Sequence, residues 1–262
     1  MQVFGFALCR YQVQNIIRCF SEKLICLQKF IVSHKVMTVL PLRGVNTLSK
    51  QRVGEKIWTI VVAAGSGSRF GSPKQFALIN DRRIVDWAVE TATISSDGVI
   101  VVLPAEQAER EGGVVGGATR SASVRCGLSA VPADATIICV HDAARPFASE
   151  FLFDEVIDAV CSGADGAVPG IPVVDTIKVV DESNVVTSTP DRRKLVAVQT
   201  PQAFRAKKLR QAHENKPEGT DDSTLVEAHG GRIVVINGDP LNRKITTPED
   251  LNWARAISRG EV

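Results

Sequence analysis

The chain has 262 residues, of which 44% are hydrophobic and 23% charged. This composition suits one large α/β domain or two small ones and excludes a globally disordered chain. The apolar runs are the length of strands rather than the roughly 18–20 residues that span a bilayer, and the net charge of +2 is too small to indicate a nucleic-acid partner. We therefore expect neither a membrane span nor a nucleic-acid ligand.

The first 54 residues differ from the rest of the chain. They carry a formal charge of +7, whereas residues 55–262 carry −5. Apolar residues recur between Ile16 and Ile31 at loose helical spacing. Three interpretations stay open: a targeting or membrane-surface helix, a partner-binding helix, or a poorly ordered extension, with translation starting at Met37 or later as one form of the third. We treat residues 1–54 as an N-terminal extension and residues 55–262 as the main domain.

The six cysteines show no CxxC spacing, so a zinc site is not indicated. We interpret them as reduced, mostly buried thiols of a cytoplasmic protein.

From Ile57 onwards, strand and helix patterns alternate. Ile57–Ala63 is a continuous apolar run, typical of a buried parallel strand. Helical patterns cover residues 84–91 and 121–130, a helix capped by Ser149, and a C-terminal helix that begins at Thr247-Pro248. Further strands are predicted at Val99–Leu103, Thr136–Val140 and Arg232–Ile236, and a hairpin at Ile177–Val180 and Val185–Thr187. The alternation predicts an α/β fold with a mostly parallel, doubly wound sheet that binds ligands at the carboxyl ends of its strands.

A glycine-rich loop, Ala63–Arg69, follows the first strand. Its small residues let the backbone approach a ligand closely, and successive N–H groups can cradle phosphate. It is not a Walker A loop, since no Gly-Lys-Ser/Thr follows, and Phe70 replaces the third glycine of a dinucleotide-binding loop. Arg69 and Lys74 beside such a loop fit a triphosphate. The alternative is a flexible loop with solvated charges.

Asp142 stands at the carboxyl end of a predicted strand. A carboxylate there suits a ribose hydroxyl, a substrate hydroxyl or a metal ion. The structural alternative is an Asp142–Arg145 pair that shapes the turn. We assign His141 to packing or hydrogen bonding, because no nucleophile or metal-ligand pattern surrounds it.

Eight motifs occur in order over about residues 56–259: AAGSGSRF, PKQF, GGATRSASV, HDAARPF, VDTIK, VQTPQAF, GTDD and RKITTPEDL. With these motifs, the chain resembles the 2-C-methyl-D-erythritol 4-phosphate cytidylyltransferases of isoprenoid precursor synthesis. The resemblance implies a Rossmann-like nucleotidyltransferase fold and transfer of the cytidylyl group of CTP to that sugar-alcohol phosphate, with release of pyrophosphate. It also implies Mg²⁺ as cofactor and a homodimer in which a β-arm, about residues 172–195, embraces the other subunit.

The resemblance further implies roles for individual residues. Arg69 and Lys74 would stabilise the transition state at the α-phosphate, while Lys244 and the neighbouring subunit's arm residue, Arg192, would position the acceptor. Asp142 would serve near the ribose and as a candidate Mg²⁺ ligand, the metal being held mostly by the CTP phosphates. The remaining nucleotide-binding candidates are Ala63, Ala64, Gly65, Gly117 and Ser123. The acceptor-binding candidates are Arg145, Thr176, Thr200, Thr220 and Thr246.

One position departs from the family pattern. Arg243 precedes Lys244 where an apolar residue is more usual, and we expect it to alter local packing without displacing the lysine. The closest alternative function is that of a ribitol 5-phosphate cytidylyltransferase. A nucleotide-dependent dehydrogenase is disfavoured by Phe70, and a non-catalytic binding module by the presence of all four candidate catalytic cations.

Overall fold

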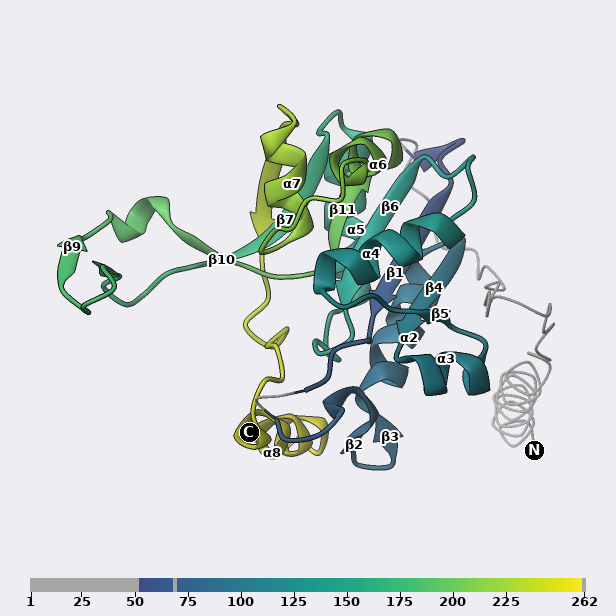
Figure 1. Cartoon of the computed structure of the whole chain (residues 1–262), viewed down its shortest axis with the longest axis horizontal. Coiled ribbons are helices and arrows are strands. Elements are labelled where there is room, and N and C mark those ends of the chain that lie inside the picture. Colours follow the sequence, from purple (N-terminus) through teal and green to yellow (C-terminus); the bar gives the residue numbers. More distant parts are fainter. Residues whose placement is uncertain (1–51, 68–69, 261–262) are drawn as a thin grey trace, which may run out of the picture. The chain divides into compact units, whose positions relative to one another are not determined.

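The structure is a computed structural model that describes residues 52–67 and 70–260. Within that part, eight strands form one sheet in the order β10-β7-β11-β6-β1-β4-β5, with β12 paired to β7 (Figure 1). Six strands run parallel, and only β10 and β11 run antiparallel to their neighbours. The strands are β1 Ile57–Val62, β4 Gly98–Leu103, β5 Val114–Val115, β6 Ile137–Asp142, β7 Gly166–Pro172, β10 Val196–Val198, β11 Gln202–Arg205 and β12 Ile233–Asn237.

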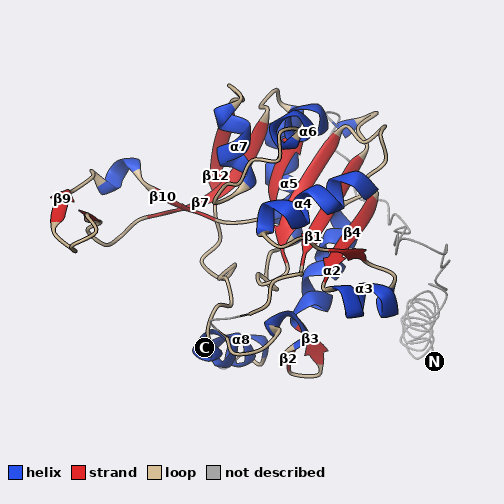
Figure 2. Cartoon of the chain, in the orientation of Figure 1, coloured by secondary structure: helices blue, strands red, loops and turns tan. Residues whose placement is uncertain are grey.

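Helices cover both faces of this sheet (Figure 2). Alternate residues of β1 point to opposite faces, as the two-residue period of a strand requires. Val61 joins the core cluster that includes residues of α2 and α5, whereas Ile60 joins the cluster that includes residues of α4, α6 and α7. The doubly wound, mostly parallel fold is therefore confirmed. The helices are α2 Ile84–Ser95, α3 Ala105–Glu111, α4 Arg120–Ala130, α5 Glu150–Cys161, α6 Ala206–His213, α7 Asp222–Ala228 and α8 Pro248–Ser258.

The local signals for helix starts are present as predicted. The Ser149 hydroxyl accepts a hydrogen bond from the amide of Leu152 at 3.2 Å at the start of α5. Thr247 and Asp250 form a capping box at the start of α8, with Pro248 as the first helical residue. Several boundaries differ from the prediction, and two of these differences lie at the site. Strand β6 runs on to Asp142, which is thus its last residue, and α4 begins one residue earlier, at Arg120.

A β-arm extends from the sheet between β7 and β10 (Figure 1). It contains the short antiparallel pair β8 (Val179–Val180) and β9 (Val186–Ser188), followed by a 3₁₀ turn, η3 (Arg192–Lys194). Every residue from 174 to 189 is exposed. The predicted hairpin and protruding arm are therefore present, and the side chains of the arm are largely exposed.

Residues 1–51 of the proposed extension, with Cys9, Cys19 and Cys26, lie outside the described residues. Arg52 packs on α5, where its guanidinium binds the carboxylates of Asp154 at 2.7 Å and Asp158 at 2.6 Å. No helix among residues 52–67 and 70–260 is long and apolar enough to cross a membrane.

Candidate active site

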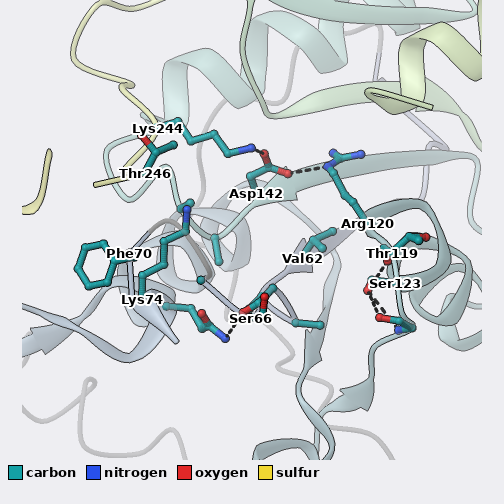
Figure 3. A pocket seen from close by; sticks show the side chains of 18 of the residues that line it. Val62, Ser66, Phe70, Lys74, Thr119, Arg120, Ser123, Asp142, Lys244 and Thr246 are labelled. Atoms are coloured by element: carbon teal, nitrogen blue, oxygen red, sulfur yellow. Dashed lines mark hydrogen bonds and ion pairs between the residues drawn. The ribbon is translucent and has the colours of Figure 1, made fainter. Parts of the chain in front are cut away.

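One cavity of about 400 Å³ opens at the carboxyl ends of β1 and β6. The glycine-rich loop after β1, the start of α4 and the segment after β12 surround it. Its side chains are drawn in Figure 3. The predicted residues that line it are Ala63, Ala64, Gly65, Lys74, Gly117, Ser123, Asp142, Lys244 and Thr246. The sheet therefore brings most of the predicted nucleotide site together from five separate stretches of sequence.

The described part of the glycine-rich loop is held by the short turn η2 (Lys74–Phe76). The side-chain amide of Gln75 donates a hydrogen bond to the carbonyl of Gly65 at 3.1 Å. Gly67 has a φ of +68°, and a Cβ there would lie 1.9 Å from the carbonyl oxygen of Ser72. Only glycine fits this position, so the tight turn that shapes the loop depends on it. Ser68 and Arg69 lie outside the described residues, so the place of Arg69 stays a prediction.

Gly117 and Ser123 form the opposite wall of the cavity. The Ser123 hydroxyl lies 3.2 Å from the amide nitrogen of Gly117 and donates to the carbonyl of Thr119 at 2.9 Å. A Cβ on Gly117 would lie 2.5 Å from the Cβ of Ala122. The backbone thus passes close to α4 and presents polar groups to whatever fills the cavity.

Asp142 lies at the centre of the site. Arg120 and Lys244 approach it from opposite sides (Figure 3). The Arg120 Nε lies 3.0 Å from Oδ1, and the Lys244 Nζ lies 2.6 Å from Oδ2. Burial alone would raise the pKa of Asp142, but the charges of Arg120 and Lys244 outweigh it and hold that pKa well below its usual value. The carboxylate is therefore ionised at neutral pH.

A second cavity of about 400 Å³ lies on the other side of this charged centre. Arg120, Asp142 and Lys244 line both cavities. The second cavity is also lined by three predicted acceptor residues: Arg145, Thr200 and Thr220. The two spaces thus meet at a shared edge that carries two cations and one carboxylate.

The Asp142–Arg145 pair considered as a structural alternative is not the main partnership of either residue. The Arg145 guanidinium instead donates to the carbonyls of Asn242 at 2.8 Å and Val198 at 3.3 Å. Arg145 is thereby fixed in the wall of the second cavity.

The residues Asn242–Thr247, which we call the Lys244 segment, cross the mouth of the first cavity. The amide of Ile245 donates to the carbonyl of Ala144 at 2.8 Å, and the Ile245 side chain is fully buried. The carbonyl of the same residue accepts a hydrogen bond from the Lys74 Nζ at 2.7 Å. The two candidate catalytic lysines, Lys74 and Lys244, are therefore linked through one short stretch of backbone.

Two predicted residues lie apart from both cavities. Arg192 and Thr176 belong to the arm, where the Arg192 guanidinium donates to the carbonyl of Val174 at 2.6 Å. Neither is among the described residues that line the two cavities of the same chain.

Arg120 is a functional candidate that the sequence reasoning missed. It occurs inside the motif GGATRSASV and is the first residue of α4. Its guanidinium joins Asp142 to the fully buried Asp222, with Nη1 2.7 Å from the Asp222 carboxylate. A basic residue at the start of a helix, where the macrodipole disfavours positive charge, was the signal that could have marked it.

His141 is fully buried beneath the site and acts as a hydrogen-bonding residue, as predicted. Its Nδ1 lies 3.0 Å from the Thr200 hydroxyl and its Nε2 lies 3.2 Å from the carbonyl of Arg145. Burial lowers the pKa of His141 from 6.5 to about 4. The neutral imidazole is therefore the form that the folded protein holds at neutral pH.

This burial predicts an acid-sensitive stability. Below pH 6.5 the unfolded chain binds a proton at His141 before the folded chain does. We therefore expect the free energy of unfolding to fall as the pH drops from 6.5 to about 4, with a slope of up to about 1.4 kcal/mol per pH unit. Urea unfolding at several pH values measures this slope, and His141→Gln should flatten it. An equal slope in both proteins would assign the effect to other groups.

Comparisons with known proteins agree with this arrangement. Residues 57–260 match the family model described as 2-C-methyl-D-erythritol 4-phosphate cytidylyltransferase. A protein of that name from Nocardia farcinica is 43% identical over 212 residues, which are 76% of this chain and 92% of the relative. A bifunctional enzyme IspD/IspF from Nitratidesulfovibrio vulgaris is 40% identical over 224 residues, and the match spans only 56% of that longer relative.

Solved structures show the same fold. The crystal structure of 4-diphosphocytidyl-2C-methyl-D-erythritol synthase from Anaerococcus prevotii superposes with a TM-score of 0.70 and 30% identity, covering 81% of this chain and all of that one. The cytidylyltransferase from Thermus thermophilus gives a TM-score of 0.67 and 33% identity, covering 78% of this chain and 99% of that one. The chain belongs to the 2-C-methyl-D-erythritol 4-phosphate cytidylyltransferase family.

Proposed function

We propose that the protein transfers the cytidylyl group of CTP to 2-C-methyl-D-erythritol 4-phosphate, giving 4-diphosphocytidyl-2-C-methyl-D-erythritol and pyrophosphate. The observation that carries the proposal is the pair of cavities that share Arg120, Asp142 and Lys244. One cavity has the glycine-rich wall that suits a nucleotide, and the other has the hydroxyl and guanidinium groups that suit a polyol phosphate. A reaction between two such ligands would take place at their common edge.

The chemistry requires cations rather than a base. An acceptor phosphate oxygen, already anionic at neutral pH, attacks the α-phosphorus of CTP, and the bond from that phosphorus to the bridging oxygen of the pyrophosphate breaks. No proton has to be removed from the nucleophile. The barrier is the repulsion between anions and the charge that grows on the leaving group, which preorganised positive groups counter. In this proposal Lys74, with Arg69, faces the triphosphate, and Lys244 faces the acceptor.

The residues present fit a magnesium ion that the nucleotide itself largely holds. Among residues 52–67 and 70–260, no three His, Cys, Asp or Glu side chains are arranged to hold a metal. Among the described residues that line the first cavity, Asp142 is the one carboxylate. Mg²⁺ commonly binds through one or two carboxylates together with substrate phosphates. We propose that Asp142 contributes to holding Mg²⁺, which when bound would neutralise phosphate charge.

We further propose that the protein is a homodimer whose arms exchange. The exposed arm presents apolar side chains, among them Val174, Val180 and Val185, with exposed fractions of 78%, 49% and 59%. Apolar groups gathered on one projecting element mark an interaction surface. The arm also carries Arg192, which its own subunit places away from both cavities. A second copy would receive that guanidinium at its acceptor side.

Subunit exchange gives this proposal a kinetic signature. Arg192→Ala and Lys244→Ala are each expected to raise the KM for the acceptor more than the KM for CTP, because in this proposal Arg192 reaches only the acceptor side and Lys244 faces the acceptor from the shared edge. Mixing Arg192→Ala subunits with Lys74→Met subunits should restore activity at low acceptor concentration, since a mixed dimer then has one pocket with both Lys74 and an intact Arg192 from the other subunit. The assay is pyrophosphate release before and after subunit exchange. Equal effects on both KM values, or no recovery on mixing, would contradict the assignment.

The proposed reaction is tested by pyrophosphate release from CTP with each of two acceptors, 2-C-methyl-D-erythritol 4-phosphate and ribitol 5-phosphate, with and without Mg²⁺. Turnover with the first acceptor and a metal requirement are expected. Preference for ribitol 5-phosphate would instead identify the protein as a ribitol 5-phosphate cytidylyltransferase. Absence of turnover with both acceptors would overturn the proposal.

We infer a cytoplasmic location from the cysteines. Cys126, Cys139 and Cys161 are free thiols, and burial raises the pKa of Cys139 to about 12. Such a thiol is inert, as expected of a structural cysteine in a reducing compartment.

A further inference from the structure

Arg243 stands beside the candidate catalytic Lys244 but faces away from the site. Its guanidinium nitrogen Nη2 lies 2.6 Å from the carboxylate of Asp250, and its Cζ lies 5.4 Å from the centre of the Trp253 ring. Both partners belong to α8, the last helix of the described residues. Arg243 therefore connects the Lys244 segment to a helix that contributes no residue to the walls of the two cavities.

Asp250 joins this contact to the rest of the segment. One of its oxygens accepts hydrogen bonds from the amide of Thr246 at 2.8 Å, the hydroxyl of Thr246 at 2.7 Å and the amide of Thr247 at 3.0 Å. The other oxygen pairs with Arg243. Burial acts to raise the pKa of Asp250, but the bonds from Thr246 and Thr247 and the charge of Arg243 lower it to about 2. A single ionised carboxylate thus holds the segment on both sides of Lys244.

Trp253 is partly buried and packs against the core cluster of Ile79, Ile84, Ile245, Leu251 and Ala254. Its ring packs edge-on against Phe147 at 6.0 Å, and Phe147 packs against Trp87 at 5.9 Å. The Arg243 guanidinium therefore lies over a ring that is itself packed against other aromatic side chains. Stacking on an aromatic face and pairing with a carboxylate are both suited to the planar guanidinium group.

The residues on either side of Arg243 and Lys244 are held by burial and hydrogen bonding. Asn242 is fully buried and donates to the carbonyl of Thr200 at 2.8 Å, and Ile245 is fully buried in the core. Between these two anchors, Lys244 depends on the backbone conformation at residues 243 and 244 for the direction of its side chain. Of these two residues, Arg243 is the one whose side chain contacts α8, through Asp250 and Trp253.

We propose that Arg243 is a positioning residue that, through Asp250 and Trp253, sets the place of Lys244 and thereby the affinity for the acceptor. The proposal rests on the proposed function for the identity of that acceptor. It assigns Arg243 no contact with either substrate. Its effect is modest because the salt bridge and the cation–π contact are partly exposed and each is weak.

The test compares Arg243→Leu, Arg243→Lys and the matched control Arg110→Leu. Arg110 lies on α3 and pairs with Glu106 at 3.8 Å on an exposed surface. Arg243→Leu is expected to raise the KM for the acceptor about fivefold to tenfold, while kcat and the KM for CTP stay within about twofold. Arg243→Lys should recover part of the loss, because a lysine can still pair with Asp250. Arg110→Leu should leave all three constants unchanged.

An unchanged acceptor KM in Arg243→Leu, or an equal rise in both KM values, would overturn the proposal. Amide hydrogen exchange provides a second readout that needs no turnover. Exchange at Thr246 and Thr247 should accelerate in Arg243→Leu and return towards the wild-type rate in Arg243→Lys. Absence of turnover in the wild type would refute the proposed function alone, whereas unchanged exchange in Arg243→Leu would refute the anchoring by Arg243.

Discussion

Replacing Lys74 with methionine is expected to lower kcat by about 10²–10³-fold, the scale for the loss of one preorganised positive donor. The methionine keeps the length of the aliphatic chain, so the packing of η2 beside the cavity is retained. The lost group is the ammonium, which lies 2.7 Å from the Ile245 carbonyl at the mouth of the first cavity. Steady-state pyrophosphate release measures kcat, and CTP binding should weaken far less than turnover.

A matched control shows whether the loss of kcat is specific to Lys74 or follows the replacement of any lysine by methionine. Lys207 lies on α6 with an exposed side chain, and Lys207→Met should keep the wild-type kcat. Near-normal turnover in Lys74→Met would remove Lys74 from the catalytic group. Arg69→Met is expected to act on the same scale as Lys74→Met if both cations face the triphosphate.

Replacing Arg120 with methionine is expected to lower the free energy of unfolding by about 3–5 kcal/mol, the usual cost of breaking a buried ion pair from one side. Arg120 joins Asp142 and Asp222, whose side chains are only 10% and 0% exposed. Without it, Asp222 is left as a buried carboxylate near the equally buried His213, 3.1 Å away. A loss of this size is a large share of the stability of an ordinary domain. Urea unfolding of the full chain measures it.

Two further variants make the Arg120 result specific. Arg125 lies on the same helix and pairs with the exposed Glu218 at 2.8 Å, so Arg125→Met should cost far less. The double variant Arg120→Met/Asp222→Asn should recover part of the stability, because the buried carboxylate is no longer charged. If the double variant is as unstable as the sum of its single changes, Arg120 does not act by neutralising Asp222.

The strands β1, β4, β6 and β12 and the edge of the sheet that carries the site could be predicted from the sequence, whereas β5, β7, β10 and β11 and the helices α3, α6 and α7 were not among the predicted elements. Ile57–Ala63 is apolar except for Thr59, a composition that predicts a strand inside a covered parallel sheet. Asp142 was expected where such a strand ends. The antiparallel β11 could not be predicted in the same way. Gln202–Arg205 is four residues long and mixed in polarity, and its place between β6 and β7 depends on long-range pairing.

Partnerships between charged side chains were harder to predict than positions. Sequence proximity pointed to Asp142 and Arg145, yet the partners of Asp142 come from residues 120 and 244. The same holds for Arg243, whose carboxylate and aromatic partners become neighbours only because the chain turns back into α8. Periodicity and motifs indicate which face of an element is buried. They do not indicate which charged side chain, distant in the sequence, will pair with a given residue of that element.

The charged edge between the two cavities has a consequence for the approach of ligands. Arg120 and Lys244 are balanced there by Asp142 and Asp222, so these four side chains together are electrically neutral. An approaching dianionic substrate is therefore attracted only weakly by these four side chains. Physiological salt also screens charge over roughly 8–10 Å, so the attraction at longer range is weaker still. These four side chains attract a ligand only when Lys244 is shared between its carboxylate and the incoming phosphate, so their part in recognition requires close contact.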